Sequence, residues 1–420
     1  MRVLLISAEY PPTPGGVGDY TALLAAHLAE AGATVSVLTS GSGTTVRDGD
    51  VTVFPIVPRW DWTIARIVRS AVENVRPDVL HLQYQTGMYG MHPAINLLAC
   101  PKPFTRRQTV YRSATVYKYA PEPQLRPWFV TTFHDLRPPY LFPKAGPLRE
   151  HVTYLLARES DAVIGTNGSD GARIGQWNRH ATVIPIGSNI PAASCLDAAG
   201  VRARYGTPDG AALLTTFGLL NHSKGIDTAI GALGVLKRQG VDARLLFVGA
   251  GAGANDPTNR ATEAALDAQC AAAGVADAVT RTGPLPADEV ARVLAASDLC
   301  LLPYRDGASP RRGSLLAALT QGIPVITTTP APHAYDGVPE PRNGEVALFV
   351  PPDDSDALAE AVRRVIDDSA LAARLRAGAA AYAARFSWSA IAAQTLAVYA
   401  ALSKREIPDD AIAPVAAGGR

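Results

Sequence analysis

A lysine that follows a strand-like run and a glycine is the strongest candidate for chemistry in this sequence. Residues 213–225 read LLTTFGLLNHSKG, so an apolar stretch runs into Gly218, and Lys224 precedes a helix-like segment. At such a turn the strand ends at the edge of a sheet, and glycine lets the backbone approach a ligand. The N–H groups of the next helix and the lysine ammonium then face negative charge. We predict an anion site at Gly218 and Lys224.

A second glycine turn lies near the beginning of the chain. The run RVLLISAEY leads into PPTPGGVGDY and then into the helical segment TALLAAHLAEAG. Gly15 and Gly16 mark this turn, and Asp19 follows it. Asp19 either holds a hydroxyl group of a second substrate or begins the helix. The two glycine turns together indicate two nucleotide-binding halves that face one cleft.

Both halves of the sequence alternate strand-like and helix-like segments. The strand-like runs are nearly continuous in apolar residues, which is typical of parallel sheets covered by helices on both faces. We therefore predict an α/β protein made of two Rossmann-like, doubly wound parallel-sheet domains. The predicted strands are residues 3–7, 34–40, 51–57, 79–85, 128–135, 162–167 and 182–187, then 213–218, 244–249, 278–283, 299–304, 323–328 and 348–352.

At 420 residues the chain is too long for one ordinary hydrophobic core. A patch rich in Gly, Pro and Asp near residues 189–210 interrupts the alternation, so we place the boundary there. The predicted parts are a first domain (1–195), a second domain (196–385), a C-terminal helix (386–405) and a flexible tail (406–420). The C-terminal helix either stays with the second domain or crosses back to the first.

Composition narrows the class of protein. The chain is 47% hydrophobic and 18% charged, with a net charge of +1, which argues against a nucleic-acid binder that depends on bulk electrostatics. Four scattered cysteines without a CxxC pair indicate a reduced protein rather than a disulfide framework or a metal site. The first residues are expected to form a strand rather than an export signal, and no apolar run is long enough for a membrane span. The expected location is the cytoplasm of a bacterium, with membrane association disfavoured and the oligomeric state open.

Ten segments, in this order and spacing, resemble the family 4 retaining glycosyltransferases of the GT-B fold. They are SAEYPPTPGGVGDY, VLHLQYQ, VTTFHDL, SDAVIGTN, VIPIGSNI, FGLLNHSKGID, LLFVGAG, ASDLCLLPYRDG, LTQGIPVITT and ALFVPPDD. The resemblance implies that the protein transfers a sugar from a nucleotide-diphosphate sugar to an acceptor hydroxyl group, with retention of anomeric configuration. It also implies that no metal or other cofactor takes part, that the second domain binds the donor, and that the first domain binds a small-molecule or glycan acceptor.

The resemblance also implies roles for individual residues. Lys224 matches the phosphate-binding lysine of the family, and His134 matches the histidine beside the donor sugar, so these two are the predicted catalytic residues. The donor-binding residues that the resemblance implies are Gly15, Gly16, Gly218, Lys224 and Gly249. An alternative donor loop at the start of a predicted helix adds Asp306, Ser309, Arg311, Arg312 and Ser314 to this prediction. The predicted acceptor-binding residues are Asp19, Tyr84 and Tyr140. His81 follows the same pattern as His134 more weakly, and we expect a structural role for it.

The sequence departs from the family at three positions. The family usually has an arginine directly after the glycine of the Lys224 turn, where this chain has Leu219. Its two glutamates, which contact the donor sugar and the nucleotide ribose, fall on Ser309 and Ala317. Two alternatives therefore stay open, namely a non-catalytic nucleotide-sugar-binding protein and a nucleotide-sugar epimerase of the same fold.

Nearby residues are candidates to replace the missing ones. Arg311 and Arg312 lie at a predicted helix start and would suit a diphosphate, and Asp306 is a candidate for the sugar contact of the first glutamate. A separate basic, tyrosine-rich segment, Cys100–Arg126, interrupts the alternation. It is either a solvated insertion or a lid that contacts the acceptor.

Overall fold

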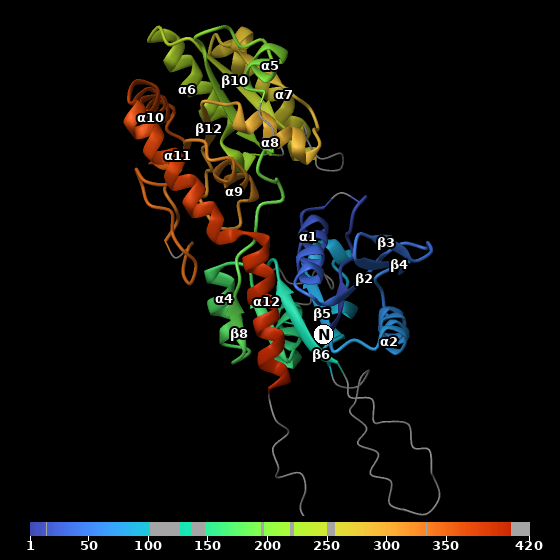
Figure 1. Ribbon diagram of the computed structural model, residues 1–420. Coiled ribbons are helices and arrows are strands. Elements are labelled where there is room, and N and C mark those ends of the chain that lie inside the picture. The colour runs from blue at the N-terminus through green and yellow to red at the C-terminus, as the bar shows by residue number, and fades with distance from the viewer. Residues whose placement is uncertain are drawn as a thin grey trace, which may run out of the picture. The chain divides into compact units, whose positions relative to one another are not determined.

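The computed structural model describes most of the chain and divides it into two compact units (Figure 1). The described residues are 1–13, 15–100, 127–136, 148–194, 197–218, 222–249, 257–332 and 334–404. Unit 1 consists of Met1–Ile164, Ile174–Thr182 and the chain from Ala392 onward, and unit 2 consists of Gly165–Arg173 and Val183–Ile391. Residues 101–126 of the predicted insertion, Tyr140, Leu219 and the predicted tail lie outside the described residues.

The first sheet has the strand order β3-β4-β2-β1-β5-β6-β7-β8 within the described residues. The pairs β1–β2, β1–β5, β2–β4 and β5–β6 are parallel, whereas β3 and β4 form an antiparallel hairpin. The strands are β1 (Arg2–Ile6), β2 (Thr34–Ser40), β3 (Val46–Asp48), β4 (Val51–Val57), β5 (Val79–Tyr84), β6 (Trp128–Phe133), β7 (Ala162–Gly165) and β8 (Ala181–Val183).

Successive residues of β1 enter different layers of unit 1, because side chains alternate across a strand. Leu4 and Ile6 join a buried cluster with Ile64 of helix α2 and Leu156 of helix α3. On the opposite face, Leu5 is paired in register with His81 of β5, which Tyr399 of α12 contacts. The helices are α1 (Gly16–Glu30), α2 (Ile64–Val75), α3 (Leu148–Glu159), α4 (Gly168–Gly175) and α12 (Trp388–Ser403).

The second sheet is parallel throughout, with the order β11-β10-β9-β12-β13-β14 in the described part of the chain. From β9 the chain proceeds to β10 on one side, and β12 joins β9 on the other. Such a reversal of direction leaves a crevice at the carboxyl ends of the two central strands, where open α/β sheets bind ligands. The strands are β9 (Ala212–Phe217), β10 (Ala243–Val248), β11 (Val279–Arg281), β12 (Leu299–Leu302), β13 (Val325–Thr328) and β14 (Leu348–Val350).

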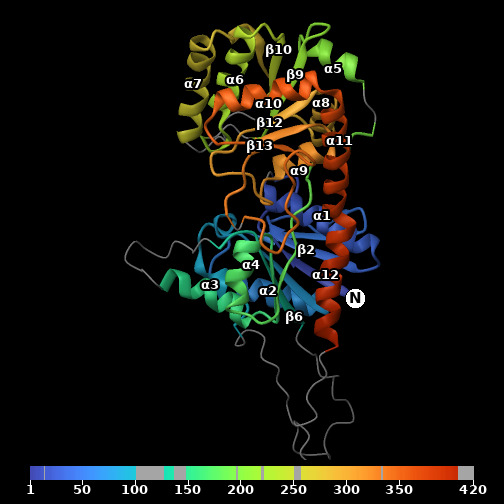
Figure 2. The same cartoon turned by 90° about the vertical axis from the view of Figure 1, so that its left-hand side faces the viewer.

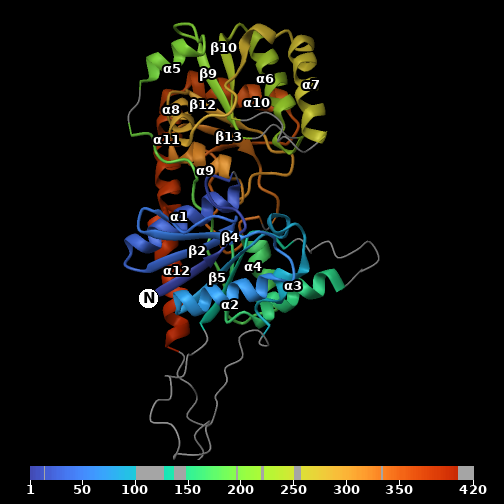
Figure 3. The same cartoon turned by 90° about the vertical axis from the view of Figure 1, so that its right-hand side faces the viewer.

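Helices cover both faces of the second sheet. Leu214 of β9 belongs to a buried cluster with α6, α7 and α10, whereas its neighbour Leu213 belongs to a cluster with α8 and α9. Figures 2 and 3 show α6 and α7 on one side of these strands and α8 and α11 on the other. The helices are α5 (Ala198–Arg204), α6 (Ile226–Arg238), α7 (Pro257–Ala272), α8 (Ala287–Ala295), α9 (Gly313–Thr320), α10 (Ser355–Asp367) and α11 (Ser369–Ala383). This arrangement confirms the predicted fold class of two Rossmann-like parallel-sheet domains.

The division into units differs from the predicted boundary after residue 195. Residues from Val183 onward belong to unit 2. Ile190 is buried in the cluster of α8 and α9, and Val183 and Ile186 pack against it. The segment from Val183 to Ile190 therefore belongs to unit 2 because of its apolar contacts. The Gly- and Pro-rich composition of the neighbouring residues gave no sign of these contacts. The predicted C-terminal helix is α12, which is assigned to unit 2 up to Ile391 and to unit 1 from Ala392.

Candidate anion and sugar sites

Lys224 lies in the loop that follows β9, on a short 3-10 turn (His222–Lys224) directly before α6. Its ammonium Nζ donates a hydrogen bond of 2.7 Å to Oγ of Ser314, at the N-terminal end of α9. Gly218 has a φ of +124° at the end of β9, and a Cβ atom there would lie 3.1 Å from Lys224 Nζ. Glycine is therefore required at position 218 for two reasons: the positive φ angle and the close approach of the Lys224 side chain.

Tyr304, two residues after the end of β12, lies against both cationic residues. Its ring centroid lies 5.1 Å from Lys224 Nζ and 4.6 Å from Arg312 Cζ, within the range of cation–π attraction. Its hydroxyl Oη lies 2.7 Å from Ser314 Oγ. Tyr304 is fully buried, which raises the pKa of its phenol and keeps the ring neutral. An ammonium and a guanidinium therefore share one aromatic ring at the carboxyl ends of β9 and β12.

The electrostatics of this cluster favour an anion. Burial and, second to it, the charge of Arg312 together lower the pKa of Lys224 to about 8. Arg312 forms an ion pair with Asp306, whose side chain is 64% exposed. One exposed carboxylate thus accompanies two cations, of which one is poorly solvated. An anionic ligand would relieve the repulsion between Lys224 and Arg312.

Arg305 holds the loops of this cluster together. Its guanidinium forms an ion pair with Asp227 in the first turn of α6, and its Nε lies 2.7 Å from Asp353 Oδ1 after β14. Its backbone N–H donates to the carbonyl oxygen of Ser223, at 3.1 Å. Tyr304 and Arg305 were not among the predicted site residues. Tyr304 ends the predicted strand LCLLPY and Arg305 follows it, directly before Asp306. This position at the carboxyl end of a strand was the signal that could have identified them.

The other predicted donor-binding residues of unit 2 lie around this cluster. Gly249, with a φ of +122°, ends β10 beside Gly218, since a Cβ on Gly249 would lie 2.9 Å from the Gly218 carbonyl oxygen. The Ser309 carbonyl oxygen accepts a hydrogen bond from the backbone N–H of Arg312, at 3.0 Å. Arg311 is turned to a different partner, because its Nη1 lies 3.4 Å from Asp170 Oδ2. The structure therefore brings Arg312, rather than Arg311, to Lys224.

Ala317 occupies the position of the second family glutamate. It is a buried residue of α9 and belongs to the apolar cluster that packs on the second sheet. The structure gives this position a packing role and places no carboxylate there.

The glycine turn of unit 1 surrounds a carboxylate. A Cβ atom on Gly15 would lie 2.0 Å from Glu9 Oε2, whereas one on Gly16 would meet nothing within 4 Å. Burial raises the pKa of Glu9, and a backbone hydrogen bond from Gly18 partly opposes this. Asp19 lies in the first turn of α1, with its backbone N–H bonded to the Gly15 carbonyl oxygen at 2.9 Å. The turn is thus closely packed at Gly15 and open at Gly16.

His134 follows β6 and is held by two neighbours. Its Nε2 lies 3.0 Å from Gln83 Oε1, and its ring meets the edge of the Tyr20 ring with centroids 4.6 Å apart. Burial lowers the pKa of His134 to about 3, so its imidazole is neutral at physiological pH. Tyr20 belongs to α1, the helix that directly follows the glycine turn at Gly15. The structure therefore places His134 beside this helix.

Tyr84 lies in the interior of unit 1. It is fully buried, and its hydroxyl group accepts hydrogen bonds from Thr86 Oγ1 at 2.9 Å and Asn96 Nδ2 at 2.8 Å. An acceptor could reach this side chain only if the core opened, so the structure gives Tyr84 a packing role. His81 is likewise buried and hydrogen-bonded, as expected for a structural histidine.

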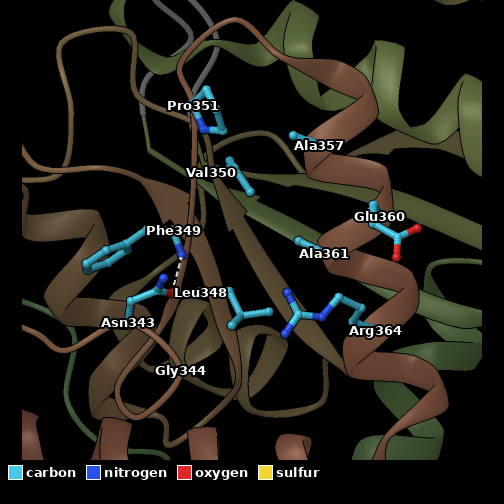
Figure 4. Close-up of a pocket in the computed structure, with 10 residues that line it drawn as sticks. All are labelled: Asn343, Gly344, Leu348, Phe349, Val350, Pro351, Ala357, Glu360, Ala361 and Arg364. Atoms are coloured by element: carbon cyan, nitrogen blue, oxygen red, sulfur yellow. Dashed lines mark hydrogen bonds between the residues drawn. The ribbon is translucent and has the colours of Figure 1, made fainter.

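A separate pocket of about 310 Å³ lies between β14 and α10 (Figure 4). Leu348, Val350 and Ala361 give it an apolar floor, with Glu360 and Arg364 at its rim. None of the predicted site residues lines it. Over the described ranges, no group of three or more His, Cys, Asp or Glu residues is arranged to hold a metal ion. No helix in the described part of the chain is both long and apolar enough to cross a membrane.

Comparisons with known proteins define the family. The sequence matches the profile of the glycosyl transferase 4-like domain over residues 15–187 and that of glycosyl transferases group 1 over residues 211–368. Two solved structures are similar over nearly the whole chain. Sucrose-phosphate synthase from Thermosynechococcus elongatus has a TM-score of 0.70 at 20% identity, covering 96% of this chain and 99% of its own. HepE from Anabaena, in complex with UDP, has a TM-score of 0.68 at 18% identity, covering 96% and 100%.

The chain belongs to the family 4 glycosyltransferases, and its two sheet domains have the GT-B fold. It is 32% identical to D-inositol 3-phosphate glycosyltransferase from a Nocardioides species over 48% of this chain and 44% of that protein. It is 29% identical to glycogen synthase from Mycobacterium tuberculosis over 97% of this chain and 96% of that protein. The match covers 56% of the D-inositol 3-phosphate glycosyltransferase from Stackebrandtia nassauensis. The chain therefore spans about half the length of these two inositol phosphate glycosyltransferases.

Proposed function

We propose that this protein transfers a sugar from a nucleotide-diphosphate sugar to an acceptor hydroxyl group, with retention of anomeric configuration and without a metal ion. The observation that carries the proposal is the pair of cations on Tyr304. Lys224 and Arg312 approach the same buried ring at the crevice of a parallel sheet, where their mutual repulsion favours a bound anion. Family membership makes a nucleoside diphosphate the best candidate for that anion.

UDP is the nucleotide we propose first. HepE was solved with UDP and with UDP-glucose, and its fold matches this chain over nearly its full length. In the proposed complex, Lys224 and Arg312 hold the diphosphate, and Gly218 and Gly249 let the nucleotide approach the backbone. Asp306 and Ser309 are proposed to contact the sugar in place of the family glutamates.

The proposed reaction needs little acid–base chemistry from the protein. The bond between the anomeric carbon and the β-phosphate oxygen breaks, and its electron pair stays on the diphosphate. Lys224 and Arg312 stabilise the negative charge that develops there. The acceptor oxygen forms the new bond on the same face of the sugar, and its proton passes to the departing phosphate oxygen. This course requires no strong protein nucleophile.

The same two cations support the proposal of metal independence. A glycosyltransferase that uses a divalent ion neutralises the leaving diphosphate with that ion, whereas here an ammonium and a guanidinium supply two positive charges. His134, the residue that the family motif assigns to the sugar, is proposed to contact it as a neutral imidazole.

Nucleotide binding tests the proposal directly. The protein would be titrated by calorimetry and thermal unfolding with UDP, GDP, ADP, TDP and their common sugars, in the presence of EDTA. A ligand at a hundred times its dissociation constant should add about 2.7 kcal/mol to the free energy of unfolding. Stabilisation by one base supports the proposal, and no response to any nucleotide contradicts it. Transfer is then followed by anomeric NMR signals, where an inverted product or inhibition by EDTA would contradict retention or metal independence.

A second candidate is a nucleotide-sugar-binding protein without transferase activity. The absence of a carboxylate at Ser309 and at the buried Ala317 favours it. Tight binding of a nucleotide sugar, with neither transfer nor donor hydrolysis across a panel of acceptors, would support this candidate. Conversion of the donor to its epimer would instead indicate an epimerase.

A further inference from the structure

Four side chains of unit 1 form a hydrogen-bonded row that ends at His134. Tyr399 Oη lies 2.5 Å from His81 Nδ1, His81 Nε2 lies 3.3 Å from Gln83 Nε2, and Gln83 Oε1 lies 3.0 Å from His134 Nε2. The first three of these side chains are fully buried. They come from α12 and β5, so the row links the C-terminal helix to the histidine that follows β6.

The chemistry of the amide gives the row a direction. The oxygen of Gln83 can only accept a hydrogen bond, so His134 must carry its hydrogen on Nε2. The nitrogen of Gln83 can only donate, so His81 Nε2 must be without a hydrogen. The hydrogen of the neutral His81 is then on Nδ1, from which it is donated to Tyr399 Oη.

Thr132 is compatible with this assignment. Its hydroxyl oxygen lies 2.7 Å from His81 Nε2 and can donate to the same lone pair. If the Gln83 amide turned over, its nitrogen would face His134, and the hydrogen of His134 would have to move to Nδ1. The tautomer of His134 therefore depends on the orientation of one buried amide.

We propose that Gln83 is a positioning residue that fixes His134 as the neutral Nε2–H tautomer, and that His81 and Tyr399 in turn fix the orientation of the Gln83 amide. The inference rests on the proposed function, because the tautomer of His134 matters for catalysis only if this residue contacts the donor sugar. It goes beyond that function because it assigns positioning roles to Gln83, His81 and Tyr399, which act without contact to a substrate.

The consequence for the reaction is electrostatic. In the Nε2–H tautomer, Nδ1 of His134 keeps its lone pair and can accept a hydrogen bond from a sugar hydroxyl group. A neutral acceptor does not oppose the positive charge that develops at the anomeric carbon, whereas an imidazolium would. Burial lowers the pKa of both His81 and His134 to about 3, so the row stays uncharged at physiological pH. The edge contact with Tyr20 restrains the imidazole ring of His134 as well.

The test combines spectroscopy with kinetics on Gln83→Met, which keeps the length of the side chain and removes both hydrogen bonds. Long-range proton–nitrogen spectra of protein labelled at its eight histidines distinguish the two neutral tautomers. The signal of His134 is assigned by its loss in His134→Gln. We expect the Nε2–H tautomer alone in the wild type and a mixture of tautomers in Gln83→Met. We also expect kcat to fall by about tenfold to a hundredfold, with the KM for the donor nearly unchanged.

Thr131→Val is the matched control. Thr131 is fully buried on β6, on the strand face opposite to Thr132, and its hydroxyl oxygen lies 2.9 Å from Ser160 Oγ. This variant loses one buried hydrogen bond outside the row, so it should keep the spectrum of His134 and the kcat. If Gln83→Met does not fold, Tyr399→Phe, which deletes a single oxygen, carries the same test.

The outcomes separate this inference from the proposed function. The inference is overturned if His134 stays wholly in the Nε2–H tautomer when the row is broken, or if kcat falls no further than in Thr131→Val. If the wild type transfers no sugar from any donor, the proposed function fails. The spectra of Gln83→Met then still decide whether the row sets the tautomer of His134.

Discussion

The ammonium of Lys224 and the guanidinium of Arg312 meet on one aromatic ring, with Nζ and Cζ 5.1 and 4.6 Å from the centroid of Tyr304. The two residues are far apart in the sequence and belong to the loops that follow the two central strands of unit 2. Attraction to the ring and the hydrogen bond from Lys224 to Ser314 hold the cations in place against their repulsion. This relationship leads to the first three predictions.

Lys224→Ala should lower the transfer rate by about a hundredfold to a thousandfold, because it removes a buried charge that stabilises the leaving diphosphate. The fold should persist, since the substitution also removes a poorly solvated cation. Steady-state kinetics and thermal unfolding together check this outcome. Turnover like that of the wild type would rule out the phosphate role of Lys224.

Arg312→Ala should weaken UDP binding more than Arg311→Ala. Loss of a charge-assisted hydrogen bond costs about 1.5–3 kcal/mol, or about ten- to a hundredfold in Kd. Only Arg312 contacts the ring that also holds Lys224, whereas Arg311 faces Asp170. Calorimetry of both variants measures the difference, with Arg342→Ala, an exposed arginine of unit 2, as the control. Equal losses for Arg311 and Arg312 would contradict the distinction that the structure makes.

UDP binding should weaken as the pH rises through about 8. Lys224 of the free protein loses its proton near this pH, because burial and Arg312 lower its pKa. A bound diphosphate favours the protonated form, so above this pH binding must take up a proton. The affinity then falls by at most about tenfold per pH unit. Calorimetry between about pH 7 and pH 9, above the second phosphate pKa of about 6, measures the slope.

Lys224→Arg is the control for this pH dependence. An arginine stays protonated throughout the range, so the decline in affinity should disappear in this variant. A decline of the same size in both proteins would show that another group is responsible.

Gly218→Ala should both destabilise the protein and weaken nucleotide binding. Its φ of +124° strains any residue with a Cβ, at a cost of about 1–2 kcal/mol. The added carbon would also lie 3.1 Å from Lys224 Nζ and displace the ammonium. Gly240→Ala, with a φ of +81° and open space around its Cβ, isolates the backbone effect. If both variants bind UDP equally well, the contact between Gly218 and Lys224 has no role in binding.

Much of the architecture could be predicted from the sequence, because periodicity and turn residues act locally. The runs that the apolar pattern predicts correspond to observed strands in both sheets. Gly218 directly follows β9 as predicted, and Gly15 directly precedes α1. The hairpin strand β3 was not predicted as a strand. Its three residues are exposed, so no apolar pattern marks it.

The roles of individual candidate residues depended more on tertiary structure. Arg311 and Arg312 are neighbours with the same chemistry, yet the start of α9 directs one to Asp170 and the other to Tyr304. Tyr84 lies in a motif that resembles the family, but its side chain joins the buried cluster of Leu80 and Leu82. The position of Arg305 between Asp227 and Asp353 likewise joins three loops that are distant in the sequence.

The sequence by itself determined the family, the two parallel-sheet domains and Lys224 as the candidate phosphate residue, because these follow from local patterns and ordered motifs. Only the tertiary structure decided that Arg312 is the second cation at Lys224 and that Tyr399, His81 and Gln83 form a row ending at His134. Charge repulsion and hydrogen-bond direction depend on distances between side chains, and those distances are set by how the strands are ordered and the helices packed.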